Sequence, residues 1–408
     1  MNKPHKYSLI SLIVAVFIIC FFCQCDLWNT PEDSDGLTIG VLLPVTGTGP
    51  VQGEATLAAI EQALDDLNDQ LFDEGDMREV SIEIIDSQFD IEQYIIGLEA
   101  LIAQDIKVIL TCGTSAEIAF IKNVIDTADV ILIDHSSTSP SLSVSDKIIR
   151  MIPDDDLTSD AMIQAMENTE IEKLITLYRN DIWGTELNTL IEDKFSLGGG
   201  TVVETIPYNA RILSVEISDK IAMLDSVVQV AFTGSLANEI AVQLISFEEG
   251  IDFMAEALKY PALMQVKWFG SDGLTLNEDI TEDALAAPFA DSVHFASPVF
   301  GEPDEAEFRA IKTLIETEVG YPVYPYVLCA YDALWIAGLT LLDDESETIA
   351  EFKTALLQNF SEHEGIFGDI ELDANENCID THFDFWGLEE SSGNYSWIKL
   401  YSIFDPEP

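Results

Sequence analysis

Apolar runs of strand length alternate along this chain with longer segments that repeat apolar residues every three or four positions. The first apolar run, residues 37–43, predicts a buried strand. After a glycine-containing turn come Leu57, Ile60, Leu64 and Leu67, whose spacing predicts an amphipathic helix. This order of strand, turn and helix predicts an α/β fold in which loops at the carboxyl ends of the strands bind ligands.

The alternation continues through two series of units, with a crossing segment near residue 150 between them. Repeated units of this kind predict parallel sheets with right-handed crossovers, and two series predict two lobes. The predicted strands are residues 80–86, 107–112, 130–134, 173–178, 201–207, 227–233 and 266–270, and the predicted helices are residues 91–104, 115–124, 156–168, 185–197, 214–224 and 236–247.

The tail of the chain has a different pattern. Residues 304–318 and 325–342 predict amphipathic helices, and residues 367–373 and 397–404 predict late strands. We expect this tail to return to both lobes, so that each lobe is discontinuous and several hinge strands connect the two.

Pro44, Thr46, Gly47, Gly53 and Asn68 follow the first strand in an ordered pattern: a proline, a Thr-Gly turn, a second glycine and a long helix that ends near an asparagine. This entry segment resembles that of the type I periplasmic solute-binding proteins. That family includes the branched-chain (Leu/Ile/Val) amino-acid receptors of ABC transporters. The resemblance implies an α/β fold of two Rossmann-like lobes with parallel sheets joined by hinge strands, the periplasmic binding protein-like I fold.

Further motifs extend the resemblance over the whole chain and suggest where the lobes divide. We expect residues 37–153 with 297–366 in the first lobe, and residues 154–296 with 367–408 in the second. The motifs are Arg150 with Pro153-Asp154-Asp155 at the entry to the second lobe, the helical Tyr331-Asp332-Ala333, and Leu372-Asp373-Ala374-Asn375-Glu376, where the family has Phe-Asp-Ala-Asn-Gly.

A dinucleotide-binding fingerprint is the alternative interpretation of the first turn, because Gly47-x-Gly49 is followed by a further glycine. Gly53 comes one residue too late for that fingerprint, and Pro50 lacks the N–H that a pyrophosphate would need. We therefore expect no cofactor.

The N-terminal segment is interpreted as an export signal, because lysines precede an apolar run that is short for a membrane span. A cysteine between such a signal and a polar tether resembles the lipid-modified cysteine of bacterial lipoproteins. We expect residues 1–25 to be a lipoprotein-type signal peptide, residues 26–36 a tether and Cys25 the lipid anchor, with Cys20 and Cys23 as alternatives. The residues before Cys25 depart from the usual lipoprotein triplet, and an uncleaved anchor would give the same topology. Either way, we expect an exported protein at the periplasmic or outer face of a membrane.

Acidic residues outnumber basic residues along the whole chain, with 74 Asp and Glu against 18 Lys and Arg and a net charge of −56. This charge disfavours nucleic acids and anionic lipid head groups as partners, and its simplest interpretation is a solvated acidic surface. Beyond residue 25 only Cys112, Cys329 and Cys378 remain, an odd number, so the fold is not expected to depend on a complete set of disulfides. No calcium-loop motif occurs and the histidines are scattered, so no metal site is predicted.

We expect no enzyme, because the chain carries no nucleophile elbow, P-loop or zinc-protease motif. His135 lies between Asp134 and Ser136, which invites comparison with a catalytic triad. Adjacent residues point in different directions along an extended loop, so these three are not expected to form one.

Three loops at predicted strand ends carry the candidate ligand-binding residues. Thr114 and Ser115 stand at a helix start, where free N–H groups and the helix dipole suit a carboxylate; helix capping is the alternative role of Ser115. Ser136, Ser137 and Thr138 stand where the resembling family has a Gly-Ala-Thr-x-Pro loop that holds the carboxylate and amino group of its ligand. The alternative for these hydroxyls is a polar surface turn.

The remaining candidates come from the second series. Asp272 stands where members of the resembling family neutralise an α-ammonium group, or it bonds to its own turn. Trp183 occupies the family's aromatic-glycine position and either covers a ligand or packs in the protein. Ser235 ends a predicted strand and is expected to face the cleft.

Donors for a carboxylate on one lobe and an acceptor for an ammonium group on the other would make lobe closure depend on the ligand. The resemblance implies a solute-binding receptor of an ABC importer, which captures an amino acid or similar small polar ligand and presents its closed form to a membrane permease. A ligand-sensing subunit of a signalling system is the alternative on the same fold.

Overall fold

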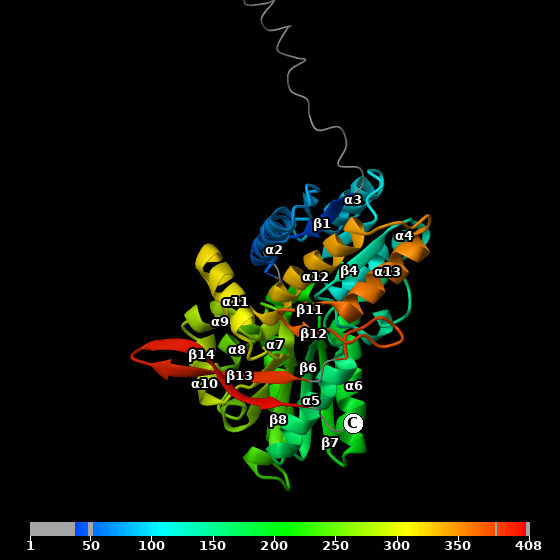
Figure 1. Ribbon diagram of the computed structural model, residues 1–408. Coiled ribbons are helices and arrows are strands. Elements are labelled where there is room, and N and C mark those ends of the chain that lie inside the picture. Colours follow the sequence, from blue (N-terminus) through cyan, green and yellow to red (C-terminus); the bar gives the residue numbers. More distant parts are fainter. Residues whose placement is uncertain (1–36, 48–51, 380–381, 405–408) are drawn as a thin grey trace, which may run out of the picture.

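Two parallel sheets organise the computed structural model, one above the other in Figure 1. The structure describes residues 37–47, 52–379 and 382–404; the predicted signal peptide, the tether and Cys25 lie outside this part of the chain. Sheet A has the order β2-β1-β3-β4-β5 and sheet B the order β7-β6-β8-β9, and every pairing in both is parallel. The strands are β1 (Thr38–Leu43), β2 (Ser81–Asp86), β3 (Val108–Thr111), β4 (Ile131–Asp134) and β5 (Ile148–Arg150) in sheet A, and β6 (Lys173–Arg179), β7 (Thr201–Tyr208), β8 (Ile240–Ile245) and β9 (Lys267–Phe269) in sheet B.

Sheet A is buried on both faces. Successive side chains of its strands point to opposite sides, and both sets belong to hydrophobic clusters. Val41 and Leu43 belong to one hydrophobic cluster and Leu42 to another. The first cluster lies beneath α2 (Gly53–Glu74), α11 (Ala306–Val319), α12 (Pro325–Leu342) and α13 (Ile349–Glu362), and the second beneath α3 (Ile91–Ile102) and α4 (Ser115–Thr127).

Sheet B is sandwiched in the same way. Leu174 packs in the cluster formed with α5 (Asp155–Asn168) and α6 (Ile182–Leu197). Ile175 packs in the cluster on the other face, formed with α7 (Leu213–Ala231), α8 (Gly250–Ala257), α9 (Glu278–Glu282) and α10 (Ala286–Ser292). The predicted α/β fold with two parallel sheets is confirmed.

Within the described residues the chain passes between the sheet A core and the sheet B cores three times, in the segments 152–161, 296–299 and 366–383. The second segment leads into β10 (Ser297–Phe300), which pairs with the antiparallel hairpin β13 (Phe383–Ser391) and β14 (Asn394–Ile403). Phe367, Ile370 and Leu372 pack against the sheet A core. The predicted lobe boundaries stay a prediction.

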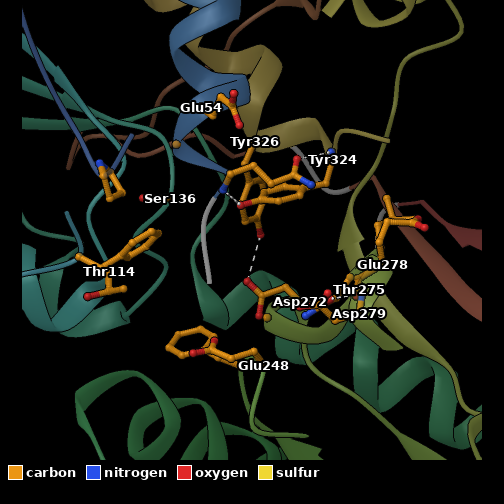
Figure 2. Close-up of a pocket in the computed structure, with 18 of the residues that line it drawn as sticks. Glu54, Thr114, Ser136, Glu248, Asp272, Thr275, Glu278, Asp279, Tyr324 and Tyr326 are labelled. Carbon is orange, nitrogen blue, oxygen red and sulfur yellow. Dashed lines mark hydrogen bonds between the residues drawn. The ribbon is translucent and has the colours of Figure 1, made fainter. Parts of the chain in front are cut away.

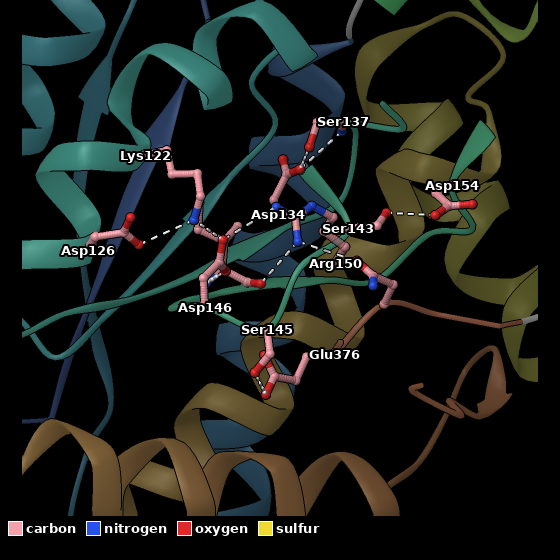
Figure 3. Close-up of polar contacts among 12 residues, drawn as sticks. Lys122, Asp126, Asp134, Ser137, Ser143, Ser145, Asp146, Arg150, Asp154 and Glu376 are labelled. Carbon is pink, nitrogen blue, oxygen red and sulfur yellow. Dashed lines mark hydrogen bonds and ion pairs between the residues drawn. The ribbon is translucent and has the colours of Figure 1, made fainter. Parts of the chain in front are cut away.

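Arg150, at the end of β5 just before the first of these segments, bonds to the third (Figure 3). Its backbone N–H donates to Glu376 O at 3.0 Å, and its C=O accepts from Cys378 N at 3.0 Å. Its buried guanidinium donates to the Asn377 side-chain oxygen at 3.3 Å and lies 4.0 Å from Asp146. The connecting segments are therefore fixed to one another at the edge of sheet A.

Two predicted elements were wrong in type. Residues 227–233 are not a strand but the end of α7 and the turn after it, and residues 236–247 hold β8 rather than a helix. Leu224, Val228 and Ala231 are buried at helical spacing, although the β-branched composition of the segment suggested a strand. All six residues of β8 are buried, so this strand lacks the alternation that would distinguish it from a helix.

Other differences concern boundaries and missed elements. The helix predicted over residues 156–168 begins one residue earlier, at Asp155, with Asp154 as its N-cap. In the segment 367–373, only Gly368–Asp369 forms a strand, which pairs with Glu364–Gly365. The sequence prediction missed α13 and β13 altogether. Among the helices that the structure describes, one, α12, is long and apolar enough to cross a membrane, but 89% of it is buried, and it is the core helix packed against α2 and sheet A.

Candidate functional site

A cleft of about 450 Å³ lies where the carboxyl ends of the two parallel sheets face one another. Loops after β1, β2, β3 and β4 line one side, loops after β6, β8 and β9 line the other, and the start of α12 closes the end. The lining residues are Pro44, Val45, Gly47, Gln52, Gly53, Glu54, Phe89, Thr114, Ser115, Ser136, Thr138, Trp183, Phe247, Glu248, Asp272, Gly273, Thr275, Leu276, Asn277, Glu278, Asp279, Tyr321, Tyr324 and Tyr326.

Two glycines of the predicted motifs are explained by close backbone approaches at this cleft. A Cβ atom at Gly53 would lie 2.0 Å from Pro44 O, and one at Gly184 would lie 2.2 Å from Arg179 O. Only glycine therefore lets α2 and α6 begin this close to the ends of β1 and β6.

The side of the cleft formed by sheet A carries hydroxyl groups, and we call Thr114, Ser115, Ser136 and Thr138 the hydroxyl wall. Thr114, not Ser115, is the N-cap of α4 and forms a capping box with Glu117, whose Oε2 accepts from Thr114 N at 2.7 Å and from Thr114 Oγ1 at 2.9 Å. Ser115 Oγ accepts from Ser139 N at 3.3 Å. Ser136 Oγ donates to Gly113 O at 2.7 Å. Much of the hydrogen-bonding capacity of this wall is thus used within the protein.

Ser137 was predicted in the site but does not line the cleft. Its N–H and its hydroxyl both donate to the buried carboxylate of Asp134. Burial raises the pKa of Asp134 to about 6, although Ser137 and Arg150 oppose that shift. Asp134 bonds to these serines rather than to His135, whose burial lowers its pKa to about 3, so a triad is not formed.

The side formed by sheet B carries acidic and aromatic groups, and we call Trp183, Phe247, Glu248, Asp272, Glu278 and Asp279 the acidic wall. Asp272 Oδ2 accepts from the Tyr326 hydroxyl at 3.2 Å, a bond that joins the acidic wall to α12 (Figure 2). Its Oδ1 is buried and has no hydrogen-bond partner among the described residues. Burial raises the pKa of Asp272 to about 6.

Asp155 stands behind Asp272 as a second buried carboxylate. It is fully buried at the first position of α5, and neither of its oxygens has a hydrogen-bond partner among the described residues. The Thr138 hydroxyl lies near it and partly opposes the rise in its pKa. Burial and the neighbouring Asp272 raise its pKa well above the usual range. The two carboxyls therefore form a coupled pair.

Trp183 and Phe247 stack in parallel on the same side, with ring centroids 4.3 Å apart. The guanidinium of Arg179 lies 4.8 Å from the Phe247 ring and bonds to Asp181 and Glu249, both at 2.5 Å. The indole N–H of Trp183 is buried and has no partner among the described residues, so it is open to an acceptor on a ligand.

Ser235 was predicted to face the cleft, and the structure contradicts this. It lies between α7 and β8, at the amino end of sheet B, because the segment before it is a helix rather than a strand. Lys173, the first residue of β6, donates to Thr233 O at 3.1 Å at this same end. Six of the eight predicted residues line the cleft, namely Thr114, Ser115, Ser136, Thr138, Trp183 and Asp272.

Apart from Asp272 and Trp183, sequence reasoning missed the acidic and aromatic members of the lining. Tyr321, Tyr324 and Tyr326 precede or begin a helix that looks like core, and Glu248 follows a strand that was predicted as a helix. The usable signal was the cluster of three tyrosines around Pro325 at the start of α12, since tyrosine joins an apolar ring to a polar hydroxyl and is enriched at binding surfaces.

The family model described as "receptor family ligand binding region" matches residues 55–391. Among curated proteins, an uncharacterized protein of Methanocaldococcus jannaschii is 24% identical over 330 residues, which cover 79% of this chain and 76% of that protein.

Solved structures share the fold. An ABC transporter substrate-binding protein from Sphaerobacter thermophilus has a TM-score of 0.72 at 18% identity, covering 91% of this chain and 98% of its own. A leucine-binding protein, LivK, from Thermotoga maritima has a TM-score of 0.70 at 15% identity, covering 90% of this chain and 99% of its own. A solute-binding protein from R. palustris in complex with benzoate has a TM-score of 0.65 at 16% identity, covering 91% and 98%. The chain therefore belongs to the receptor ligand-binding-region family and has the type I periplasmic binding protein fold that its motifs predicted.

Proposed function

We propose that this protein is an extracytoplasmic solute-binding receptor of an ABC importer, which captures an amino acid or a similar small polar ligand in the cleft. The observation that carries this proposal is the position of the cleft between the carboxyl ends of two parallel sheets, the place where open α/β folds bind ligands. Its volume of about 450 Å³ suits a small molecule.

The mechanism we propose is closure of two lobes on the ligand. Residues 37–153 with 297–366 would form one lobe, and residues 154–296 with 367–408 the other. A ligand that contacts both the hydroxyl wall and the acidic wall gains those contacts only when the walls are close, so it favours the closed state. The connecting segments near Arg150 would act as the hinge, and a membrane permease would bind the closed form.

The proposal is tested by a thermal-shift screen of ligand-stripped protein against amino acids, amides, amines and short peptides. A ligand raises the melting temperature progressively with its concentration. Small-angle scattering of the same samples should show a smaller radius of gyration with the ligand. A protein that neither shifts nor contracts with any of these compounds would refute the proposal.

The family description as a receptor ligand-binding region favours a second candidate, a ligand-sensing subunit of a signalling system on the same fold. Uptake of the radiolabelled ligand by cells that lack the gene separates the two functions. Lost uptake supports transport, whereas unchanged uptake with an altered cellular response supports sensing.

We also propose that the mature protein is held at the membrane by a lipid on Cys25, which lies outside the described residues. Mass spectrometry of the protein from its native membrane should find diacylglycerol on that cysteine, and Cys25→Ser should abolish the modification. A lipid that persists in Cys25→Ser would move the anchor to Cys20 or Cys23.

A further inference from the structure

The cleft has a strongly one-sided charge. Five carboxylates line it, Glu54, Glu248, Asp272, Glu278 and Asp279, whereas no Lys, Arg or His stands among its described lining residues. Figure 2 shows these acids on both sides of the space, with Glu54 at the start of α2 and the other four on the acidic wall. An anionic group on a ligand would meet repulsion here without a compensating cation.

Buried acceptors in this wall have no donor. The Oδ1 of Asp272, which lines the cleft, lacks a hydrogen-bond partner among the described residues. Asp155 does not line the cleft itself but is a fully buried neighbour of Asp272, and neither of its oxygens has a hydrogen-bond partner in the described part of the chain, although the Thr138 hydroxyl lies near it. Buried polar groups without partners are rare in proteins, so an acceptor of this kind on a lining residue, backed by a second buried carboxyl group, points to a donor supplied by a ligand. An ammonium group has several N–H donors and the charge that two adjacent carboxylates require.

The guanidinium of Arg179, on this side of the cleft, is already neutralised. Arg179 lies behind Phe247, where Asp181 and Glu249 both bond to it, and it does not line the cleft. The hydroxyl wall offers no cation, and the hydroxyls of Thr114 and Ser136 are bonded to Glu117 and Gly113. The Trp183 indole N–H is a single neutral donor, too little to offset the acids for a free carboxylate.

Aromatic rings supply the rest of the lining. Their faces attract organic cations and cover hydrocarbon at the same time. Within the described residues, no three His, Cys, Asp or Glu side chains are grouped so that they could hold a metal ion, which favours an organic cation over an inorganic one. The rings are those of Phe89, Trp183, Phe247, Tyr321, Tyr324 and Tyr326.

We propose that the ligand is a small organic cation without a free carboxylate, an alkylamine, alkyl diamine or amino amide. Its ammonium group lies against Asp272, whose charge the neighbouring Asp155 supports from within the protein, and its hydrocarbon lies among the aromatic rings. The proposal rests on the proposed function only in taking this cleft as the ligand site. It narrows the ligand from zwitterions and neutral solutes to compounds of net positive charge.

The test is a set of four compounds that share one branched side chain. Leucine is a zwitterion, leucinamide has the same ammonium group with the carboxylate masked, 3-methylbutylamine lacks the carboxylate, and 4-methylpentanoate lacks the ammonium group. 1,4-Diaminobutane and 1,5-diaminopentane extend the set to two charges. Calorimetric titration of ligand-stripped protein at pH 7.5 and low salt measures each dissociation constant.

We expect leucinamide or one of the amines to bind at least tenfold more tightly than leucine, and 4-methylpentanoate not to bind. Leucine binding more tightly than leucinamide would overturn the cation assignment while leaving the proposed receptor function intact. If neither these compounds nor the wider screen of amino acids, amides and peptides gave binding or contraction, both proposals would be overturned.

A matched pair of variants locates the effect in the cleft. Asp155→Asn removes the buried carboxyl group beside Asp272, and Glu83→Gln removes an exposed carboxylate from β2. We expect Asp155→Asn to weaken the best amine at least tenfold and Glu83→Gln to change it less than twofold. Equal effects from the two variants would mean that only the general acidity of the protein attracts cations, and would overturn the proposed contact.

Discussion

The two walls of the cleft differ in how far their polar groups are satisfied. On the hydroxyl wall, Thr114 and Ser136 already bond to Glu117 and Gly113. On the acidic wall, Asp272 and the neighbouring Asp155 keep acceptor atoms without donors. The hydrogen bonds of the hydroxyl wall are therefore largely made within the protein, whereas the acidic wall keeps acceptors that we propose a ligand fills.

This difference separates residues that shape the cleft from residues that select what enters it. A satisfied hydroxyl contributes stability whether or not a ligand is present. Burial raises the pKa of Glu248, Asp272 and Glu278, so their charged forms are disfavoured until a cation arrives. We expect the selectivity of the receptor to reside in the acidic wall.

The largest effect is expected from Asp272→Asn, which keeps the shape of the side chain and its acceptor for the Tyr326 hydroxyl. Loss of the charge should weaken binding of the best amine by about 100-fold, or roughly 3 kcal/mol, as expected for removing one partner of a buried charge pair. Calorimetric titration measures it, with Glu83→Gln as the control. Unchanged affinity would remove Asp272 from the site.

Ser137→Ala should affect stability instead of binding. It removes the hydroxyl that donates to the buried Asp134 carboxylate and leaves the backbone N–H bond in place. This loss should lower the free energy of unfolding by about 2 kcal/mol. Urea unfolding at pH 7.5 measures the loss, and amine affinity should stay within about twofold. A tenfold loss of affinity with unchanged stability would place Ser137 in the binding site after all.

Lowering the pH should weaken amine binding. The pKa of Asp272 is raised to about 6 by burial, and only the ionised form attracts an ammonium group. Affinity should therefore fall by about tenfold for each pH unit below 6, where Asp272 holds a proton. A flat profile between pH 7.5 and 5, measured by titration of the wild-type protein, contradicts the assignment.

The same raised pKa has an opposite consequence for stability, because the folded protein holds the proton on Asp272 more tightly than the unfolded chain does. The free protein should lose about 3 kcal/mol of folding stability as the pH rises from about 4 through 6. Asp272→Asn, which cannot ionise, should lack this loss in urea unfolding.

The smallest effect is expected from Ser136→Ala. Its hydroxyl lines the cleft but donates to Gly113 O, so affinity for an amine should change by less than about threefold. A tenfold loss would show that the hydroxyl wall holds the ligand directly, and it would restore the zwitterion as the preferred ligand class.

Much of the cleft followed from sequence because helix and strand ends are encoded locally. Gly53 and the prolines before it predicted a turn after β1, and the apolar run before Asp272 predicted a strand that ends there. The structure has both loops at the carboxyl ends of strands, where they line the cleft. The prediction that Ser137 lines the cleft was not met. Ser136 and Thr138 reach the cleft while Ser137 turns toward Asp134, and no sequence pattern distinguishes these three hydroxyl residues.

The sequence by itself determined the α/β class, the parallel sheets and the family, because hydrophobic period and glycine positions are local properties of the chain. It did not determine the type of residues 227–247, since a fully buried strand and a buried helix have the same apolar content. Only the tertiary structure decided which polar groups lack partners. Tyr326 and Asp272 are 54 positions apart in the sequence but are hydrogen-bonded in the fold. Asp155 becomes a neighbour of Asp272 only when α5 and the turn after β9 pack together. The charge of the cleft is therefore a property of the folded chain.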